Sequence, residues 1–324
     1  MTADEPRKDL DLLIIGDCNP DVLVLGDDVT PAFGQQEKLV DAISLVIGGS
    51  AAITAVAAAR LGLRVGLAAA VGADAAGEFM LAQLAGEGVD TTAVVVRAGM
   101  ATGMTVALSR GTDRAILTAL GAIPTLAASE VPAGLLGRAR HVHVSSYFLL
   151  ADSLGPGLPE LLATARSLGV RTSMDTNWDP SGRWGGEQLG AVLAVTDLLL
   201  PNEAEARHIA GTASAGEAIA ALAAVGPQVV VKLGADGAMC HDGARSYRIS
   251  PPTGVPGPVV DATGAGDCFN AGLIAGLLRG LDLPSAARLG CAVGTASTRA
   301  AGGTGGAPDL PTALAFAETA TVRA

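Results

Sequence analysis

Two aspartates flank a glycine-rich turn near the C-terminal end of the chain, in the stretch PVVDATGAGDCFNAGLIAGLL at residues 258–278. A short apolar run leads into Asp261, the turn follows, and Asp267 stands where a long apolar helix is expected to begin. The first amides of a helix have no partner inside the helix and favour a bound anion. A carboxylate beside a bound phosphate is suited to take a proton from an attacking hydroxyl group. The stretch therefore indicates phosphoryl transfer with Asp267 as the base; the alternative is that Asp267 only stabilises the helix start.

Two common nucleotide-binding motifs do not describe this turn. No Lys-Ser or Lys-Thr pair follows the glycines, as a P-loop requires, and Phe269 stands where a dinucleotide-binding fingerprint has its third glycine. A dehydrogenase is excluded on the same ground, because no such fingerprint follows an early strand.

A second group of polar residues follows the first buried strand, which is expected at residues 10–17. Asp17, Asn19 and Asp21 offer oxygen atoms and an amide that suit the hydroxyl groups of a polyol. The alternative is a simple Asn-Pro turn with Asp21 at its edge. Further along, Gly48 and Gly49 precede a helix expected at 50–62, where Ser50 offers a hydroxyl group.

The order of the expected elements predicts the fold class. Strands at 10–17, 64–72, 141–146 and 228–232 alternate with helices at 50–62, 75–88 and after 203, which is typical of a mainly parallel sheet covered on both faces. The β-rich pieces at about 22–47 and 93–118 do not fit these layers and are expected to form a small separate sheet. We therefore expect one three-layer α/β/α domain over residues 1–324, with a mainly parallel central sheet and a small β-sheet lid.

The sequence DATGAGDCFNAG resembles the C-terminal signature of the ribokinase-like (PfkB-type) carbohydrate kinases, D-T-x-G-A-G-D-x-F-x-A-G. This resemblance implies that Asp267 is the catalytic base. It also implies that Gly264, Ala265 and Gly266 supply amides that hold the transferred phosphoryl group. Ala262 stands where the family usually has threonine, which removes one side-chain contact but no backbone amide.

The resemblance extends over nearly the whole chain. IIGDCNPDVLV resembles the first family strand, where an N-x-D pair contacts the sugar; Asn19 and Asp21 match it, and Asp17 is a further candidate. VIGGSAAIT resembles the N-terminal signature and implies that Gly48 and Gly49 line the sugar site, with Ser50 adding a hydroxyl. Ile53 replaces the usual asparagine, which we expect to remove a polar group near the substrate.

The nucleotide side of the site is implied by three further segments. PNEAEARH resembles the family's N-x-x-E region, so that Asn202 and Glu205 are expected near Mg²⁺, acting through water; an N-cap role for Asn202 is compatible with this. VVVKLGADG resembles the ATP-binding strand and turn. The ATP contacts implied are listed here: Asn202, Lys232, Gly234, Gly237, Thr263, Gly264 and Gly266.

Two more sites are weaker expectations from the same resemblance. Asp261, with the segment at 299–308, is a candidate ligand for a monovalent cation such as K⁺. The segment TSMDTNWDP resembles the family's D-x-N region and brings Asp175 and Asn177 toward the active cleft. His141 and His143 share one face of a strand, but no third metal ligand accompanies them.

The activity implied is an ATP-dependent transfer of the γ-phosphate to a hydroxymethyl group of a small sugar, with ATP and Mg²⁺ as cofactors. A nucleoside kinase of the same fold and a non-catalytic sugar-binding protein are the alternatives. Aromatic residues make up only 3% of the chain, which favours a plain sugar over a nucleoside because bases usually stack on rings. A sugar phosphate is a further possible acceptor, because basic residues occur near the expected lid: Arg97, Arg110 and Arg114.

Composition limits the partners. A formal charge of −11 argues against nucleic acid and anionic membranes. The uncharged run at 42–59 is better explained as a strand, a Gly-Gly turn and an alanine-rich helix than as a membrane span. The four cysteines form no CxxC pair, and the charged N-terminus shows no signal peptide, so a cytoplasmic protein is expected. A lid sheet with an apolar outer face further predicts a homodimer through the lid.

Overall fold

The computed structural model describes residues 8–110 and 113–324, and in this part of the chain the strands form two sheets. The large sheet has ten strands in the order β14-β13-β12-β11-β10-β9-β8-β1-β4-β5. Its parallel part contains β11 (Gln228–Lys232), β10 (Leu198–Leu199), β9 (Arg171–Met174), β8 (His141–Val144), β1 (Leu12–Ile15), β4 (Val65–Gly72) and β5 (Asp90–Arg97). Three antiparallel strands extend one edge: β12 (Ala238–His241), β13 (Ser246–Ile249) and β14 (Val322–Arg323).

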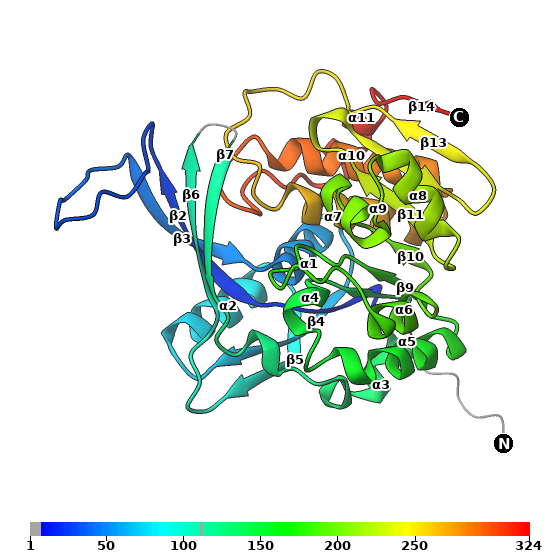
Figure 1. Cartoon of the computed structure of the whole chain (residues 1–324), viewed down its shortest axis with the longest axis horizontal. Helices are drawn as coiled ribbons and strands as arrows, with labels where there is room; N and C mark the ends of the chain where they lie inside the picture. The colour runs from blue at the N-terminus through cyan, green and yellow to red at the C-terminus, as the bar shows by residue number, and fades with distance from the viewer. Residues whose placement is uncertain (1–7, 111–112) are drawn as a thin grey trace.

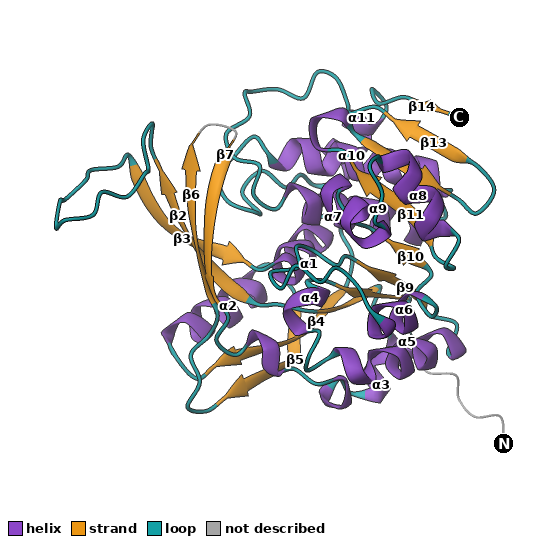
Figure 2. Ribbon diagram, in the orientation of Figure 1, coloured by secondary structure: helices purple, strands orange, loops and turns teal. Residues whose placement is uncertain are grey.

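Helices cover both faces of this sheet, as Figures 1 and 2 show. One hydrophobic cluster lies between the sheet and α1 (Ser50–Arg60), α2 (Ala75–Gly86), α9 (Ala265–Leu278), α10 (Leu283–Ser297) and α11 (Leu310–Ala317). A second cluster lies between the opposite face and α3 (Ala133–Arg138), α4 (Tyr147–Leu150), α5 (Leu158–Ser167), α6 (Glu187–Leu193), α7 (Glu203–Ala210) and α8 (Ala215–Ala223). The predicted three-layer α/β/α architecture is confirmed.

Small residues allow the helices of the first cluster to pack closely. A Cβ atom added at Gly272 of α9 would lie 2.7 Å from Cγ2 of Val293 and 3.0 Å from Cα of Gly290, both on α10. The eight central residues of α1, from Ala51 to Ala58, are all buried, and five of them are alanine. A core with few large aromatic side chains can still be densely packed here, because the small residues let the helix backbones approach one another closely.

The small sheet contains β3 (Ala42–Gly48), β2 (Asn19–Leu25), β6 (Met104–Arg110) and β7 (Asp113–Ala119), in that order. It stands away from the large sheet at one side of the molecule (Figure 1). The predicted lid sheet is therefore confirmed, but its second segment was placed too early. Residues 90–97 instead form β5 at the edge of the large sheet. An edge strand with one partly exposed face has the same alternation of apolar and polar residues as a lid strand. That one domain spans 1–324 stays a prediction.

The uncharged run at 42–59 forms β3, a turn and most of α1, as expected. Within residues 8–110 and 113–324, no helix combines the length and the apolar character needed to cross a bilayer. All four cysteines are buried and free of disulfides. Burial raises the pKa of the thiols of Cys240, Cys268 and Cys291 to about 12, so these thiols are inert. A cytoplasmic location stays a prediction.

The side chains of His141 and His143 on β8 are both buried and share one hydrogen-bonding partner. Ser173 Oγ is 2.7 Å from both His141 Nε2 and His143 Nδ1, so one hydroxyl joins the two rings. Among the described residues, no group of three or more His, Cys, Asp and Glu side chains could hold a metal ion. Burial lowers the pKa of both imidazoles, that of His143 to about 4 from an ordinary 6.5, so both rings are neutral at pH 7.

This burial predicts a pH-dependent contribution of His143 to stability. Because its pKa is lower in the folded protein, that contribution is complete above pH 6.5 and is lost as the pH falls toward 4. The unfolding free energy of the wild type should fall relative to that of His143→Gln by about 3 kcal/mol over this range. Urea unfolding at pH 7, 6, 5 and 4 measures the difference, and a constant difference between the two proteins would contradict the neutral buried ring.

Candidate active site

The start of α9 lies at the carboxyl edge of the large sheet and contains the glycine turn. Gly264 is the N-cap residue with φ +71°, and a Cβ there would lie 2.7 Å from Cα of Gly303. Glycine is therefore required by both conformation and space. No side chain caps this helix start. The amide of Ala265 donates to the Ala262 carbonyl at 3.3 Å, whereas those of Gly266 and Asp267 meet no loop or side-chain acceptor among the described residues. Two amides at this helix start are therefore available to an anion, and the predicted anion site at the turn stays a prediction.

Asp267 is the third residue of α9 and is only 7% exposed. Burial raises the pKa of its carboxyl well above the usual range, and the charge of Asp175 raises it further. The positive charge of Lys232 and a hydrogen bond from Ser50 act in the opposite direction. The carboxyl is therefore a stronger base than an exposed aspartate, and it lies beside two unoccupied amides.

Lys232, at the end of β11, lies directly behind this turn. Its ammonium group pairs with the carboxylate of Asp175, which is fully buried, and lies 3.4 Å from Asn270 Oδ1. Asn270 Nδ2 donates to Asp175 Oδ2 at 2.6 Å. A Cβ added at Gly266 would lie 3.4 Å from Lys232 Nζ. Burial alone would lower the pKa of Lys232, but attraction to Asp175 and Glu205 raises it, so the lysine is a fixed positive charge.

The loop before α1 is held by Asp17. Its Oδ2 accepts from the amide of Ser50 at 3.0 Å and its Oδ1 from that of Ala51 at 2.9 Å. The N-cap position itself is Gly49 at φ +78°, which has no side chain to do this. Asp17 therefore caps the helix from the end of the neighbouring strand, and this fixes the position of the Ser50 hydroxyl.

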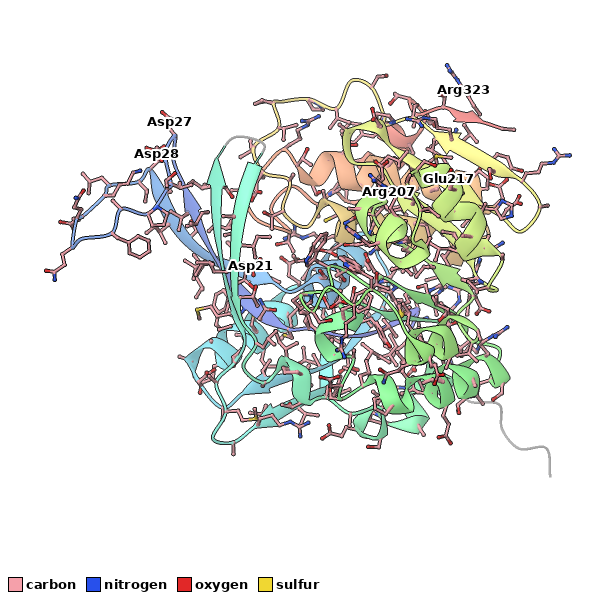
Figure 3. All side chains as sticks on the ribbon, viewed as in Figure 1. Asp21, Asp27, Asp28, Arg207, Glu217 and Arg323 are labelled. Atoms are coloured by element: carbon pink, nitrogen blue, oxygen red, sulfur yellow. The ribbon has the colours of Figure 1, made fainter. Side chains whose placement is uncertain are left out.

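Asn19 and Asp21 lie where the lid meets the large layer, both buried on β2 (Asp21 is labelled in Figure 3). Asn19 Nδ2 donates to Asp21 Oδ1 and to Thr105 Oγ1 on β6, at 3.2 Å each. The Asp21 carboxylate contacts the backbone of Gly48 so closely that any Cβ there would overlap it. The predicted N-x-D pair and glycine pair thus lie together.

Asn177 connects this loop to β9. Its Nδ2 donates to Ser50 Oγ at 2.9 Å, and its Oδ1 accepts from the amide of Ser146 at 2.7 Å. Ser146 and Asn270 were not singled out from the sequence. Asn270 could have been found, because it lies one helical turn after Asp267 and so on the same face of α9. Ser146 carries no such signal; its left-handed conformation, φ +56°, is visible only in the structure.

Asn202 and Glu205 form a capping box at the start of α7. Asn202 Oδ1 accepts from the Glu205 amide at 2.9 Å, and Glu205 Oε2 accepts from the Asn202 amide at 2.8 Å. The predicted N-cap role of Asn202 is confirmed. Asn202 also bridges to Lys232, the last residue of β11. Burial and the charge of Asp175 raise the pKa of Glu205 to about 7.

Asp261 binds two segments together. Its Oδ1 accepts from the amide and the hydroxyl of Thr263 at 2.9 and 2.7 Å, and its Oδ2 accepts from the amide of Gly302 at 2.9 Å. The carboxylate therefore fixes the approach to the glycine turn against the segment at 299–308.

Ile53 does not face the polar groups, contrary to expectation. It is 3% exposed and packs behind the turn, where a Cβ at Gly264 would lie 3.0 Å from its Cγ2 and one at Gly303 would overlap its side chain. Ile53 therefore adds apolar packing between two glycine segments.

Gly234 and Gly237 shape the turn between β11 and β12, with φ of +58° and +86°. Gly237 faces the Ile249 carbonyl too closely for any side chain. The turn therefore requires glycine at both positions, and their contact with ATP stays a prediction.

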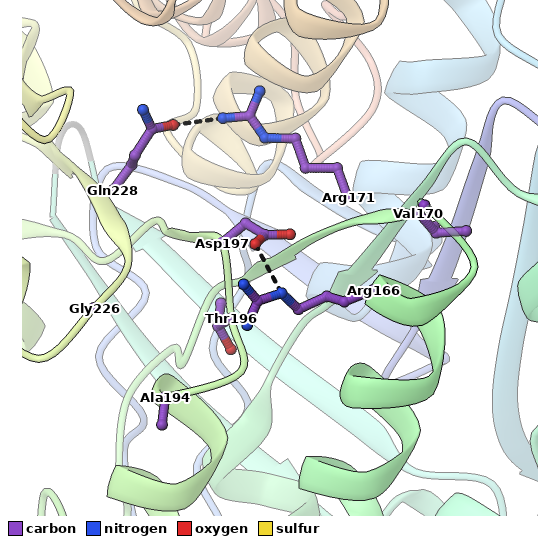
Figure 4. A pocket seen from close by; sticks show the side chains of 9 residues that line it. Arg166, Val170, Arg171, Ala194, Thr196, Asp197, Gly226 and Gln228 are labelled. Atoms are coloured by element: carbon purple, nitrogen blue, oxygen red, sulfur yellow. Dashed lines mark hydrogen bonds and ion pairs between the residues drawn. The ribbon is translucent and has the colours of Figure 1, made fainter.

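A cavity of about 580 Å³ lies at the opposite, amino-terminal edge of the sheet (Figure 4). Arg171, the first residue of β9, hydrogen-bonds Gln228 there, and Arg166 pairs with Asp197 at 3.1 Å. Because ligands of open α/β sheets bind at the carboxyl ends of strands, we assign the active site to the start of α9 and not to this cavity.

An α/β/α fold with a lid, and a buried carboxyl beside free helix amides, define a phosphotransferase acting on a hydroxyl group. Residues 10–310 match the protein family described as pfkB family carbohydrate kinase. The chain belongs to this family and is an ATP-dependent carbohydrate kinase.

Relatives in the family act on different acceptors. A nucleoside kinase of Methanothermobacter thermautotrophicus is 30% identical over 292 residues, 88% of each chain. A ribokinase of Haemophilus influenzae is 29% identical over 85% of this chain and 89% of its own. A crystal structure of a putative ribokinase II of E. coli with ATP and Mg²⁺ has a TM-score of 0.81 and 25% identity, covering 95% of this chain and 99% of that one.

Proposed function

We propose that the protein transfers the γ-phosphate of ATP to a hydroxymethyl group of a small sugar, as ribokinases and fructokinases do. The observation that carries this proposal is the position of Asp267, buried in the first turn of α9 beside the free amides of Gly266 and Asp267. Such an arrangement holds a phosphoryl group and a proton acceptor within one helical turn.

In the proposed mechanism Asp267 accepts the proton of the attacking hydroxyl. The amides of Gly266 and Asp267 bind the oxygens of the transferred group, and Lys232, behind Gly266, adds positive charge as negative charge moves toward the turn. The hydroxyl of Ser50, fixed by Asn177 at 2.9 Å, orients the carboxyl of Asp267.

The nucleotide is proposed to lie over the C-terminal half, against Asn202, Lys232, Thr263 and the β11–β12 turn with Gly234 and Gly237. Mg²⁺ bound to the phosphates would neutralise their charge. The donors present fit this ion: Glu205 has one oxygen bound to the Asn202 amide and offers its carboxylate to coordinated water, and Mg²⁺ prefers such oxygen donors.

The sugar is proposed to bind between the lid and the loop before α1. Asn19 and Asp21 would accept and donate hydrogen bonds to sugar hydroxyls, together with Ser50 and the backbone of Gly48 and Gly49. Asp17 contributes indirectly, because both of its oxygens hold the start of α1.

The alternatives differ in their support. A nucleoside acceptor is supported by the similarity to a nucleoside kinase. A sugar phosphate is less favoured, because Arg97 is held by Glu130 at 2.6 and 2.8 Å; the side chains of Arg110 and Arg114 lie outside the described ones. A non-catalytic sugar-binding protein would not need the base and the free amides together.

Asp267→Asn tests the mechanism. Asparagine keeps the shape but cannot accept the proton, so ADP release in the presence of pentoses, hexoses, keto-deoxy acids or nucleosides should fall about 100-fold to 10,000-fold. Asp309→Asn is the matched control, since Asp309 only caps α11 and asparagine caps equally well. Normal turnover by Asp267→Asn would show that another group is the base.

We also propose a monovalent cation, such as K⁺, beside Asp261. The buried carboxylate and the segment at 299–308 that it holds lie next to the glycine turn, so a cation there would stabilise the turn. Activity should be several-fold higher in KCl than in tetramethylammonium chloride at equal ionic strength. Equal rates in the two salts would exclude the site.

We further propose a homodimer formed through the outer face of the lid. Strand register aligns Leu45, Val22, Val106 and Leu117 in one row across all four strands, on the face opposite Asp21. Leu45 and Leu117 are 47% and 64% exposed, and Ile43 in the next row is 65% exposed. A second copy would cover this apolar face.

Leu117→Lys should convert the dimer to a monomer, because it places a charge in the centre of the proposed interface. Light scattering should report a mass near 64 kDa, twice the 32.0 kDa of one chain, for the wild type and near 32.0 kDa for the variant. Val259→Lys changes an apolar side chain that is 50% exposed outside the lid and should leave the dimer intact. A monomeric wild type would contradict the proposal.

A further inference from the structure

The few aromatic residues of this chain are concentrated near the active site. The chain has five Phe, two Trp and two Tyr residues. Four of these nine side chains and one histidine form a connected group, called the aromatic cluster here: Tyr147, Phe148, Trp178, Trp184 and His208. Both tryptophans lie in the loop between β9 and α6. In a protein whose core is built from alanine and glycine, this concentration requires its own explanation.

Trp178 and His208 are the exposed members of the aromatic cluster, and Trp178 is the larger of the two rings. Trp184 stacks on His208 with ring centroids 4.5 Å apart and an angle of 11° between the planes. Trp178 stands at 86° to both rings, 4.6 Å from Trp184 and 5.7 Å from His208. It therefore lies along the side of the stacked pair, and 54% of its surface remains exposed. The indole is thus held rigidly while much of it stays available.

The loop between β9 and α6, which carries both tryptophans, contains two residues in a strained backbone conformation. Asn177 and Trp184, neither of them glycine, both have φ +53°. Asp179, which is 4% exposed, fixes the loop by accepting from the Ser181 amide at 2.8 Å, its hydroxyl at 2.6 Å and the Trp184 amide at 2.7 Å. Left-handed conformations at such residues cost energy and are concentrated at ligand sites. These left-handed conformations do not serve to bury Trp178 in the core, because about half of its surface stays exposed.

The aromatic cluster lies between the loop before α1 and helix α7. Asn177, the residue before Trp178, donates a hydrogen bond to Ser50, whose hydroxyl lies close enough to Asp267 to lower the pKa of its carboxyl. On the other side, His208 follows Glu205 by three residues on α7 and so lies one helical turn further along the same face. The exposed indole is therefore one residue away from a chain of contacts that leads to the catalytic carboxyl.

We propose that Trp178 forms a stacking subsite for a second ring of the acceptor, remote from the hydroxyl group that is phosphorylated. The ligand is an acceptor larger than a monosaccharide, whose second ring lies flat on the indole. A glycosidically linked sugar offers an apolar C–H face and a nucleoside offers a base, and both stack on tryptophan. This inference rests on the proposed function, because it assigns the acceptor class of the same site.

Fluorescence tests the subsite without requiring catalysis. In Trp184→Phe, Trp178 is the sole tryptophan, and its emission should change on titration with one class of two-ring compound and not with glucose, fructose or ribose. Maltose and sucrose represent linked sugars, and adenosine and cytidine represent nucleosides, so the responding arm identifies the second ring. No change with any of the four, in a protein that does phosphorylate one of them, would overturn the proposal.

Kinetics supply the second readout. Trp178→Ala should reduce the ratio of kcat/KM for the responding two-ring acceptor to kcat/KM for a single-ring acceptor by about tenfold, and Trp178→Phe should restore most of it. Val225→Ala, which changes a side chain with the same 54% exposure at the opposite edge of the sheet, should leave the ratio unchanged. An unchanged ratio in Trp178→Ala would also overturn the subsite. If the fluorescence responds but no acceptor yields ADP, the kinase function fails while the subsite stands.

Discussion

The proposed active site depends on the positive charge of a single lysine that lies among several buried acids. Asp175, Glu205 and Asp267 are each less than 9% exposed and lie close enough to influence one another. Lys232 pairs with Asp175 and lowers the pKa of both of the others. Without this ammonium group, an ionised Asp175 would have no opposite charge in the interior. Breaking a buried ion pair in this way lowers the free energy of unfolding by about 3–5 kcal/mol.

The same lysine links the chemistry to the backbone. Its ammonium group lies behind Gly266, so a side chain at that position would press on it. Asn270 bonds both members of the pair from one turn further along α9, and the amide of Asn177 bonds the other oxygen of Asp175 at 3.1 Å. Asn177 then fixes Ser50, and Asp17 fixes the helix on which Ser50 lies. One hydrogen-bonded network therefore runs beside the glycine turn, from Lys232 through Asp175 and Asn177 to the loop before α1.

Local patterns in the sequence predicted the parts of this site that lie within one segment. The glycine turn, the buried aspartate in the first turn of α9 and the capping role of Asn202 all follow from residues a few positions apart. The Lys232–Asp175 pair joins residues 57 positions apart, and Lys232 alone looked like an ATP contact or a surface charge. The packing of Ile53 near Gly303 could not be predicted, because Gly303 is supplied by a distant loop. The position of β5 was missed because an exposed edge strand has the same alternation as a lid strand. The rings of Trp184 and His208 likewise meet only in the folded chain.

The pH dependence of kcat/KM in the wild type and in Lys232→Met measures whether this lysine controls the base. Asp267 must be ionised to accept a proton, so the rate should rise with pH through its pKa. Removal of the positive charge raises that pKa, so the acid limb should move to higher pH. Circular dichroism of the variant would confirm that the fold is retained. An acid limb that stays at the same pH in the folded variant would contradict the account.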